Sequence, residues 1–380
     1  MGRQRRARSV AKRDTYGPLM SLALLRFLAS HVFVQRGYRL DFVRMGLGIE
    51  HRAKRFAAVW TPHFERSKKA QAEWWTEKPE GSTKRRLAVL GAGRLLDFSE
   101  TSLLGCSHVD LLDADPLCRS AWSALQRKHP SIKFSFHTCE LSGCLASWDK
   151  QFLKESRGMD WDSALKILAR LEPPERSPLR DYLDEHSPTH ILSLNILSQI
   201  PVMWQDKLER GLMKRFGKLK VEECEDEWIA AFAPSARKLL RAHLSDLAAC
   251  AGASMLLLSD VEYLYYPASV NPGEIIRDNP FDWAETEDGG EWKLQPVFDK
   301  LLDESWKDGC FRMDALYEIN VENLKMLSVM FPGHVSALRS SWLWHICPEP
   351  ENNQTEAVIH RVRAIELATR NDVLTGETVT

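Results

Sequence analysis

Two short apolar segments, each ending in residues suited to hold a ligand, constrain the fold of this chain more than any other feature. The first covers residues 87–90 and stops on Gly91-Ala92-Gly93, and the second covers residues 109–112 and stops on Asp113. Two buried strands, with a glycine turn after the first and an acid about twenty residues further on, describe a Rossmann-type nucleotide half-site. The sequence therefore predicts an α/β fold built on a doubly wound sheet.

The class of nucleotide follows from the residue at the third position of the glycine pattern. A dinucleotide fingerprint carries a small residue there, which lets the helix pack closely under a pyrophosphate. This chain has Leu96, which disfavours NAD and FAD, although a nicotinamide-dependent oxidoreductase remains a rival. S-adenosylmethionine contains adenosine but no phosphate, so a glycine turn and a ribose-binding acid are sufficient for it. A glycine turn in an unrelated α/β protein is the remaining alternative.

The segments VLGAGRLLDF and VDLLDADP resemble the first and second motifs of class I S-adenosylmethionine-dependent methyltransferases. The resemblance implies that Gly91, Ala92 and Gly93 lie along the methionine and ribose. It also implies that Asp113 holds the ribose and that Glu140, after the third strand, meets the adenine. Many of those enzymes have a further glycine where this chain has Arg94 or Leu95. For Glu140 a surface carboxylate on a turn is equally open, and Asp115 is interpreted as a helix N-cap.

A fourth strand is predicted at residues 190–194, and it ends on Asn195. In the resembled class this strand ends beside the transferred methyl group, which implies that Asn195 and Gln199 orient the methyl acceptor. The alternative is that Asn195 caps the turn and Gln199 faces solvent, since Asn is a common turn residue.

Methyl transfer needs a general base only if the acceptor is protonated at neutral pH. Candidate bases are His63, Glu262 and His345, and the sequence does not select one of them. His63 is placed among the catalytic candidates because its predicted helix could cover the site. A packed or surface histidine is the alternative, since titration near neutrality does not by itself identify a base.

The predicted organisation begins with a basic flexible tail (1–17) and a helical N-terminal cap layer (18–80). A Rossmann-like core (84–350) follows, with an insertion or lid at about 263–300, and the chain closes with a polar tail (351–380). One helix is predicted in that tail, at residues 356–368. Over residues 45–365 the chain also resembles uncharacterised bacterial methyltransferase-like proteins, on the segments SLNILSQIP and WLWHICPE and an AxxWxxHxxRS-like pattern.

The net charge and the cysteine content limit the classes of partner and ligand that we expect for this chain. The net charge of −1 does not suit polyanion binding by the whole chain, and the eight cysteines include no CxxC pair. They are interpreted as reduced thiols of a cytoplasmic protein without a metal site or membrane span. We therefore expect an S-adenosylmethionine-dependent methyltransferase with a small-molecule acceptor, nucleic acid being an unlikely partner and the oligomeric state open. The alternatives are a non-catalytic methyltransferase-like protein that binds a nucleoside or partner, and an RNA-modifying enzyme using the basic tail.

Overall fold

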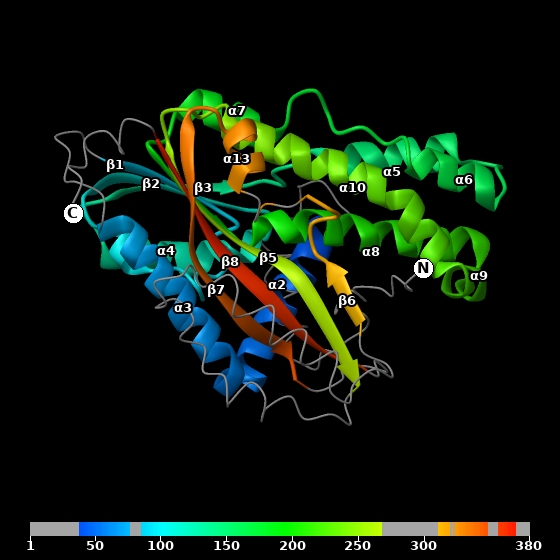
Figure 1. Ribbon diagram of the computed structural model, residues 1–380, viewed down its shortest axis with the longest axis horizontal. Helices are drawn as coiled ribbons and strands as arrows, with labels where there is room; N and C mark the ends of the chain where they lie inside the picture. Colours follow the sequence, from blue (N-terminus) through cyan, green and yellow to red (C-terminus); the bar gives the residue numbers. More distant parts are fainter. Residues whose placement is uncertain are drawn as a thin grey trace.

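A mixed sheet of eight strands forms the centre of the molecule (Figure 1). The computed structural model describes residues 38–76, 85–267, 311–319, 321, 324–348 and 356–369. Seven strands follow the order β3-β2-β1-β4-β5-β8-β7, and β6 pairs with the outer part of β5. Their bounds are β1 (Arg85–Leu90), β2 (Cys106–Asp113), β3 (Lys133–Thr138), β4 (His190–Leu194), β5 (Ser254–Pro267), β6 (Phe311–Asp314), β7 (His334–Cys347) and β8 (Glu356–Thr369).

The first five strands pair in parallel, as the apolar runs of the sequence predict. Their order, 3-2-1-4-5, is compatible with a Rossmann-like doubly wound sheet, whose ligands bind where the strand order reverses, here between β1 and β4. The strand next to β5 distinguishes this sheet from that of a dinucleotide-binding fold. It is β8, which lies between β5 and β7 and runs antiparallel to both. The second half of the sheet therefore does not repeat the parallel mononucleotide-binding unit of the first half.

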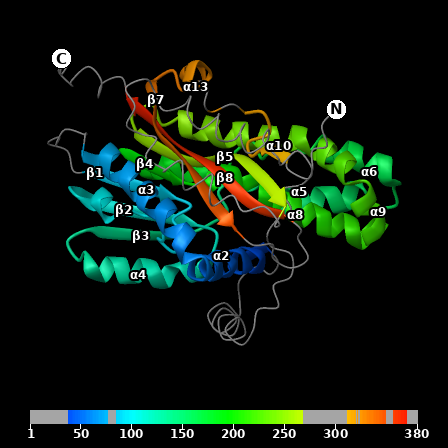
Figure 2. The ribbon, with the colours of Figure 1, turned by 60° about the horizontal axis from the view of Figure 1, so that its bottom comes forward.

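Two helices precede the sheet, α2 (Tyr38–Arg55) and α3 (Ala57–Thr76). Helix α3 lies along β7, and the two are seen side by side in Figures 1 and 2. Its buried side chains anchor it: the indole N–H of Trp60 donates to the carbonyl of Ile346, and that of Trp75 donates to the carbonyl of Leu104. These tryptophans thus belong to the core.

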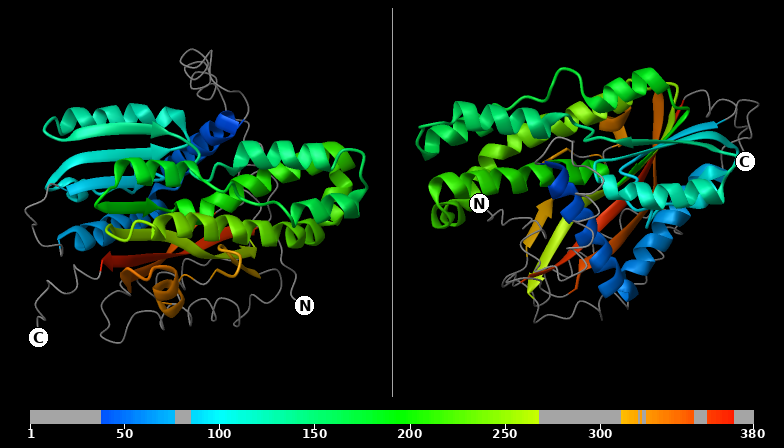
Figure 3. Two further views of the ribbon diagram at one scale, coloured as in Figure 1. Left: turned by 90° about the horizontal axis from the view of Figure 1, so that it is seen from above. Right: turned by 180° about the vertical axis from the view of Figure 1, so that it is seen from behind.

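A set of helices extends beyond the sheet and has an apolar core of its own (Figure 3). Trp148, Trp204 and Trp228 are fully buried in it, together with Phe232. The helices concerned are α5 (Cys144–Glu155), α6 (Trp161–Leu168), α8 (Ile196–Phe216), α9 (Lys218–Glu223) and the first half of α10 (Glu225–Ala248). The remaining helices are α4 (Arg119–Lys128), α7 (Pro178–His186), α13 (Leu324–Met330) and the short 3-10 turns η1 (Glu100–Leu103) and η2 (Pro116–Cys118).

The prediction of a helix at residues 356–368 is wrong, because this segment is strand β8. Nearly every described side chain of β8 is buried, since the strand has neighbours on both edges and is covered on both faces. A strand buried on both faces loses the alternation of polar and apolar residues that would identify it. Its β-branched residues Val358, Ile359, Val362 and Ile365 are the signal that favours a strand.

The predicted lid also begins too early, because β5 continues through Pro267 and pairs there with β8. The rest of that segment, 268–300, lies outside the described residues, as does the predicted basic tail. Among the residues that the structure describes, no helix combines the length and apolarity needed to cross a membrane.

Candidate functional site

The turn after β1 and the acid after β2 are joined by hydrogen bonds at the carboxyl edge of the sheet. The N–H of Gly93 donates to Oδ2 of Asp113 at 2.9 Å, and the N–H of Asp115 donates to Oδ1 at 2.8 Å. The carbonyl of Gly93 in turn accepts from the indole N–H of Trp122 at 2.9 Å. Each carboxylate oxygen of Asp113 keeps a lone pair for a further donor, because a carboxylate has about four acceptor sites.

The two glycines of the turn differ in what surrounds them. Gly91 has a φ of +68°, and a Cβ there would lie 2.7 Å from the carbonyl oxygen of Leu194, so the packing of β1 against β4 requires glycine. Gly93 has a φ of +47°, but the nearest atoms to a Cβ would be the carbonyl oxygen of Gly91 at 3.8 Å and Oδ2 of Asp113 at 4.0 Å. A Cβ at Gly93 would therefore meet only ordinary van der Waals contacts, one of them with the ribose-binding candidate.

Loss of hydration raises the pKa of Asp113 to about 6, and the neighbouring carboxylate of Asp115 adds to this rise. The backbone hydrogen bonds from Asp115 and Gly93 act in the opposite direction. The side chain is half-buried. Asp113 is therefore charged at neutral pH but gains its proton at a higher pH than an ordinary aspartate.

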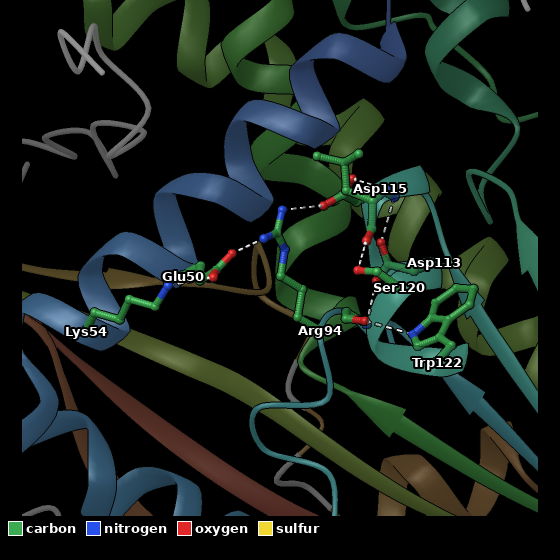
Figure 4. Close-up of polar contacts among 9 residues, drawn as sticks. Glu50, Lys54, Arg94, Asp113, Asp115, Ser120 and Trp122 are labelled. Atoms are coloured by element: carbon green, nitrogen blue, oxygen red, sulfur yellow. Dashed lines mark hydrogen bonds and ion pairs between the residues drawn. The ribbon is translucent and has the colours of Figure 1, made fainter. Parts of the chain in front are cut away.

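Arg94, which follows the glycines, connects this turn to helix α2 (Figure 4). Its guanidinium pairs with Glu50 of α2 and lies 3.5 Å from Oδ2 of Asp115. Asp115 also accepts from the N–H of Leu117 at 2.9 Å, which makes it the N-cap of η2, in agreement with its interpretation from the sequence. Helix α2 approaches so closely that a Cβ at Gly46 would lie 2.2 Å from Oδ2 of Asp115.

Leu95 explains why the glycine motif is degenerate. Its φ of +62° lies in the left-handed region, which a glycine adopts without strain. The backbone thus keeps the glycine-type turn although the residue is leucine, and the side chain packs against the core instead.

The predicted adenine contact, Glu140, is engaged by its own loop. Its Oε1 accepts from the N–H and hydroxyl of Ser142, and its Oε2 lies 3.3 Å from the N–H of Leu145 in the first turn of α5. Burial raises its pKa. Glu140 therefore orders the loop after β3, and its role toward adenine stays a prediction.

Asn195 lies beside the glycine turn, as predicted for two strand ends of one parallel sheet. Its φ is +50°, its N–H donates to the carbonyl of Leu258 at 2.9 Å, and the following residue, Ile196, is next to Gly91. The Oδ1 of Asn195 is buried and has no hydrogen-bond partner among the described residues. Gln199, in the first turn of α8, is half-buried.

His63 is buried and hydrogen-bonded, whereas a general base needs access to its substrate. It is 2% exposed on α3, its ring stacks on that of Trp344 with centroids 3.9 Å apart, and its Nδ1 accepts from the indole N–H of Trp342 at 3.0 Å. Burial lowers its pKa to about 3, so the ring is neutral at neutral pH. A catalytic role for His63 stays a prediction. Because Nδ1 accepts from Trp342, Nε2 carries the proton of the neutral ring and can donate but not accept a hydrogen bond.

The other two candidate bases are also engaged. His345 contacts the hydroxyl of Tyr266, and burial lowers its pKa to about 4. Glu262 accepts from Nε of Arg361 at 3.0 Å.

Three further polar residues of this region were not selected from the sequence. Asp260 ends the parallel part of β5 and is fully buried, with His360 of β8 beside it. Asp97 lies after the glycine turn. Burial raises its pKa to about 6, and the negative charge of Asp260 contributes to this rise. The strand-end position of Asp260 could have identified it, but His360 could not be found while β8 was interpreted as a helix.

No group of three or more His, Cys, Asp or Glu side chains in the described part of the chain is arranged to hold a metal ion. No protein-family model matches the sequence, and neither does any curated protein sequence. Among solved structures, one described as the crystal structure of PRMT6 is similar, with 10% sequence identity and a TM-score of 0.23. The alignment covers 73% of this chain and 67% of that one. A likeness of this size carries no argument about function, which has to come from the residues of the site.

Proposed function

We propose that this protein is an S-adenosylmethionine-dependent methyltransferase that acts on a small-molecule acceptor. The observation that carries the proposal is the pairing of Asp113 with the glycine turn: the carboxylate accepts from the N–H of Gly93 and keeps lone pairs for further donors. A ribose diol fits this carboxylate, because each hydroxyl can donate to one oxygen.

The antiparallel β8 supports a mononucleoside over a dinucleotide. A dinucleotide fold uses two parallel halves, one for each nucleotide, and only the first half is complete here. Leu96 stands where a pyrophosphate-binding helix would need a small residue, and Arg94 in the same turn is already paired with Glu50. The residues present therefore fit a cofactor with a single adenosine, held by Gly91, Ala92, Gly93 and Asp113, with Glu140 near the adenine.

In this proposal Asn195 and Gln199 orient the acceptor, and His63 supports the site from α3. Positioning supplies most of the acceleration in a methyl transfer, since the nucleophile needs only to be aligned with the methyl carbon. A side chain at the end of β4, next to the glycine turn, is suitably placed for that task.

Isothermal titration with S-adenosylmethionine tests the proposal. We expect binding to the wild-type protein and at least about a tenfold loss of affinity in Asp113→Asn, because a hydrogen bond to a charged group is worth about 1.5–3 kcal/mol. Asp160→Asn is the matched control, since Asp160 also accepts from a backbone N–H (that of Ser163, at 2.8 Å) but lies at the start of α6. Absence of binding to the wild-type protein, or equal affinity of Asp113→Asn, would falsify the proposal.

The alternative, a non-catalytic nucleoside-binding protein, predicts the same titration but no methyl transfer. Mass spectrometry of an acceptor panel incubated with protein and cofactor distinguishes the two. A mass gain of one methyl group on any acceptor supports the enzyme.

A further inference from the structure

A buried polar group lies where β5 leaves the parallel part of the sheet, next to the candidate site. We call it the Asp260 corner and define it as Asn195, Ser198, Asp260 and His360. The hydroxyl of Ser198 lies 3.2 Å from Oδ2 of Asp260 and 3.3 Å from the backbone carbonyl of Asn195, which joins the ends of β4 and β5.

Asp260 is a buried carboxylate without a permanent counter-charge. It is 0% exposed, and its Oδ1 has no hydrogen-bond partner in the described part of the chain. Among the described residues, the titratable side chain at ion-pair distance is His360, whose Nδ1 lies 3.0 Å from Oδ2 but is not aligned for a hydrogen bond. His63 also faces Asp260, and it is neutral. Buried charges are ordinarily paired, because leaving one unpaired is costly.

A second acceptor in the same corner is also unused. Oδ1 of Asn195 is buried without a partner, although the residue as a whole is half-buried. The unpartnered oxygens are Oδ1 of Asp260, which belongs to a carboxylate, and Oδ1 of Asn195. A ligand group with several donor hydrogens and a positive charge would satisfy both.

The ring of His360 is held between aromatic neighbours. It lies against Tyr263, with ring centroids 4.2 Å apart, and near Trp344, with centroids 5.5 Å apart. These contacts fix the orientation of the ring whose Nδ1 lies beside Asp260.

We propose that the Asp260 corner binds an amine as the methyl acceptor, which rests on the proposed methyltransferase function. Asp260 and Asn195 hold the ammonium group, and His360 removes its proton. Asn195, the half-buried member, marks the side from which the amine enters. A carboxylate acceptor is repelled by Asp260, and a hydroxyl has one hydrogen and leaves one of the two oxygens unpartnered.

The proton and electron balance is simple. Nδ1 of His360 takes one proton from the ammonium group, which leaves a neutral amine with a lone pair. This lone pair attacks the methyl carbon, so that an N–C bond forms while the C–S bond breaks and its electron pair stays on sulfur. The sulfonium becomes a neutral thioether, the methylated nitrogen carries the positive charge, and the proton leaves His360 for solvent.

Three probes of matched shape test the inference: benzylamine, benzyl alcohol and benzoate, titrated calorimetrically without cofactor. We expect benzylamine to bind at least about tenfold more tightly than the other two, and this preference to be lost in Asp260→Asn. Asp246→Asn is the matched control, because Asp246 also accepts from a serine hydroxyl (Ser177, 2.6 Å) but at the end of α10. It should keep the preference.

Asn195→Gly provides a second variant in case Asp260→Asn fails to fold. Glycine accepts the left-handed backbone at this position, so the variant removes Oδ1 without strain. We expect it to weaken benzylamine binding severalfold. His360→Gln should retain benzylamine binding but slow methyl transfer to benzylamine in the presence of cofactor.

The inference is overturned if benzylamine does not bind at about 10 mM, if another probe binds as tightly, or if the variants keep the wild-type preference. The cofactor titration above separates this failure from that of the proposed function. Cofactor binding without amine binding removes the acceptor assignment alone, whereas amine binding without cofactor binding removes the proposed function.

Discussion

The indole N–H of Trp342 donates a hydrogen bond to Nδ1 of His63 at 3.0 Å, and this contact joins β7 to α3 across 279 positions of the sequence. Both residues are almost fully buried. The bond fixes the imidazole in the tautomer with its proton on Nε2, because Nδ1 acts as acceptor.

Trp342→Phe should destabilise the protein by about 1–3 kcal/mol, since it leaves Nδ1 of His63 buried without a partner. Urea unfolding of Trp342→Phe, His63→Phe and the double variant measures the coupling between the two residues, which we expect to exceed about 0.5 kcal/mol. Trp75→Phe combined with His63→Phe is the control. Trp75 donates to Leu104 and not to His63, so that pair should be additive.

Gly91→Ala should be more destabilising than an ordinary glycine replacement at positive φ. The new Cβ would lie 2.7 Å from the carbonyl of Leu194, in addition to the strain of a φ of +68°. Gly158→Ala isolates the strain, because Gly158 has a φ of +76° and open space around it. We expect about 1–2 kcal/mol for Gly158→Ala and clearly more for Gly91→Ala in chemical denaturation. Equal losses would mean that the turn relaxes around the added methyl group.

His243→Leu should stabilise the protein, most strongly in acid. Both ring nitrogens of His243 are buried without partners, and burial lowers its pKa to about 4. The unfolded chain binds the proton at pH 6.5 and the folded chain at about 4, so between these values stability falls by up to about 1.4 kcal/mol per pH unit as pH falls. Urea unfolding at pH 7, 6 and 5 should show a shallower loss in the variant. An unchanged slope would contradict the assignment.

The affinity for S-adenosylmethionine should rise with pH through about 6. Asp113 has its pKa raised to about 6, and only the charged carboxylate accepts from both ribose hydroxyls. Titrations at pH 5 and pH 7.5 should differ by several fold in the wild-type protein. In Asp113→Asn this difference should disappear, and its persistence would assign the titration to another group, such as Asp97.

The strand–turn–strand unit around Gly91 and Asp113 could be predicted because its determinants are local. The apolar runs set the strands, the glycines set the turn, and the parallel order brings Asn195 to the same edge. The conformation of Leu95 could not be predicted from the motif, because its backbone has the positive φ typical of glycine although the residue is leucine.

The features that could not be predicted are contacts between residues far apart in the sequence. Strand β8 is buried on both faces, so its hydrophobic pattern fits a helix and a strand equally well. The pairing of Asp260 with His360 joins residues 100 positions apart and requires β8 to be in place. The helical core around Trp148 and Trp204 likewise forms between elements whose individual sequences predict only helices.

The position of β8 also has a consequence for biosynthesis. The slot between β5 and β7 is filled by the strand that leaves the ribosome after every other strand described here. Until β8 has been synthesised, the facing edges of β5 and β7 lack their partner strand. Unpaired strand edges can pair with other chains and cause aggregation. The sheet is therefore completed only when β8 pairs with β5 and β7, and the same pairing brings His360 to Asp260.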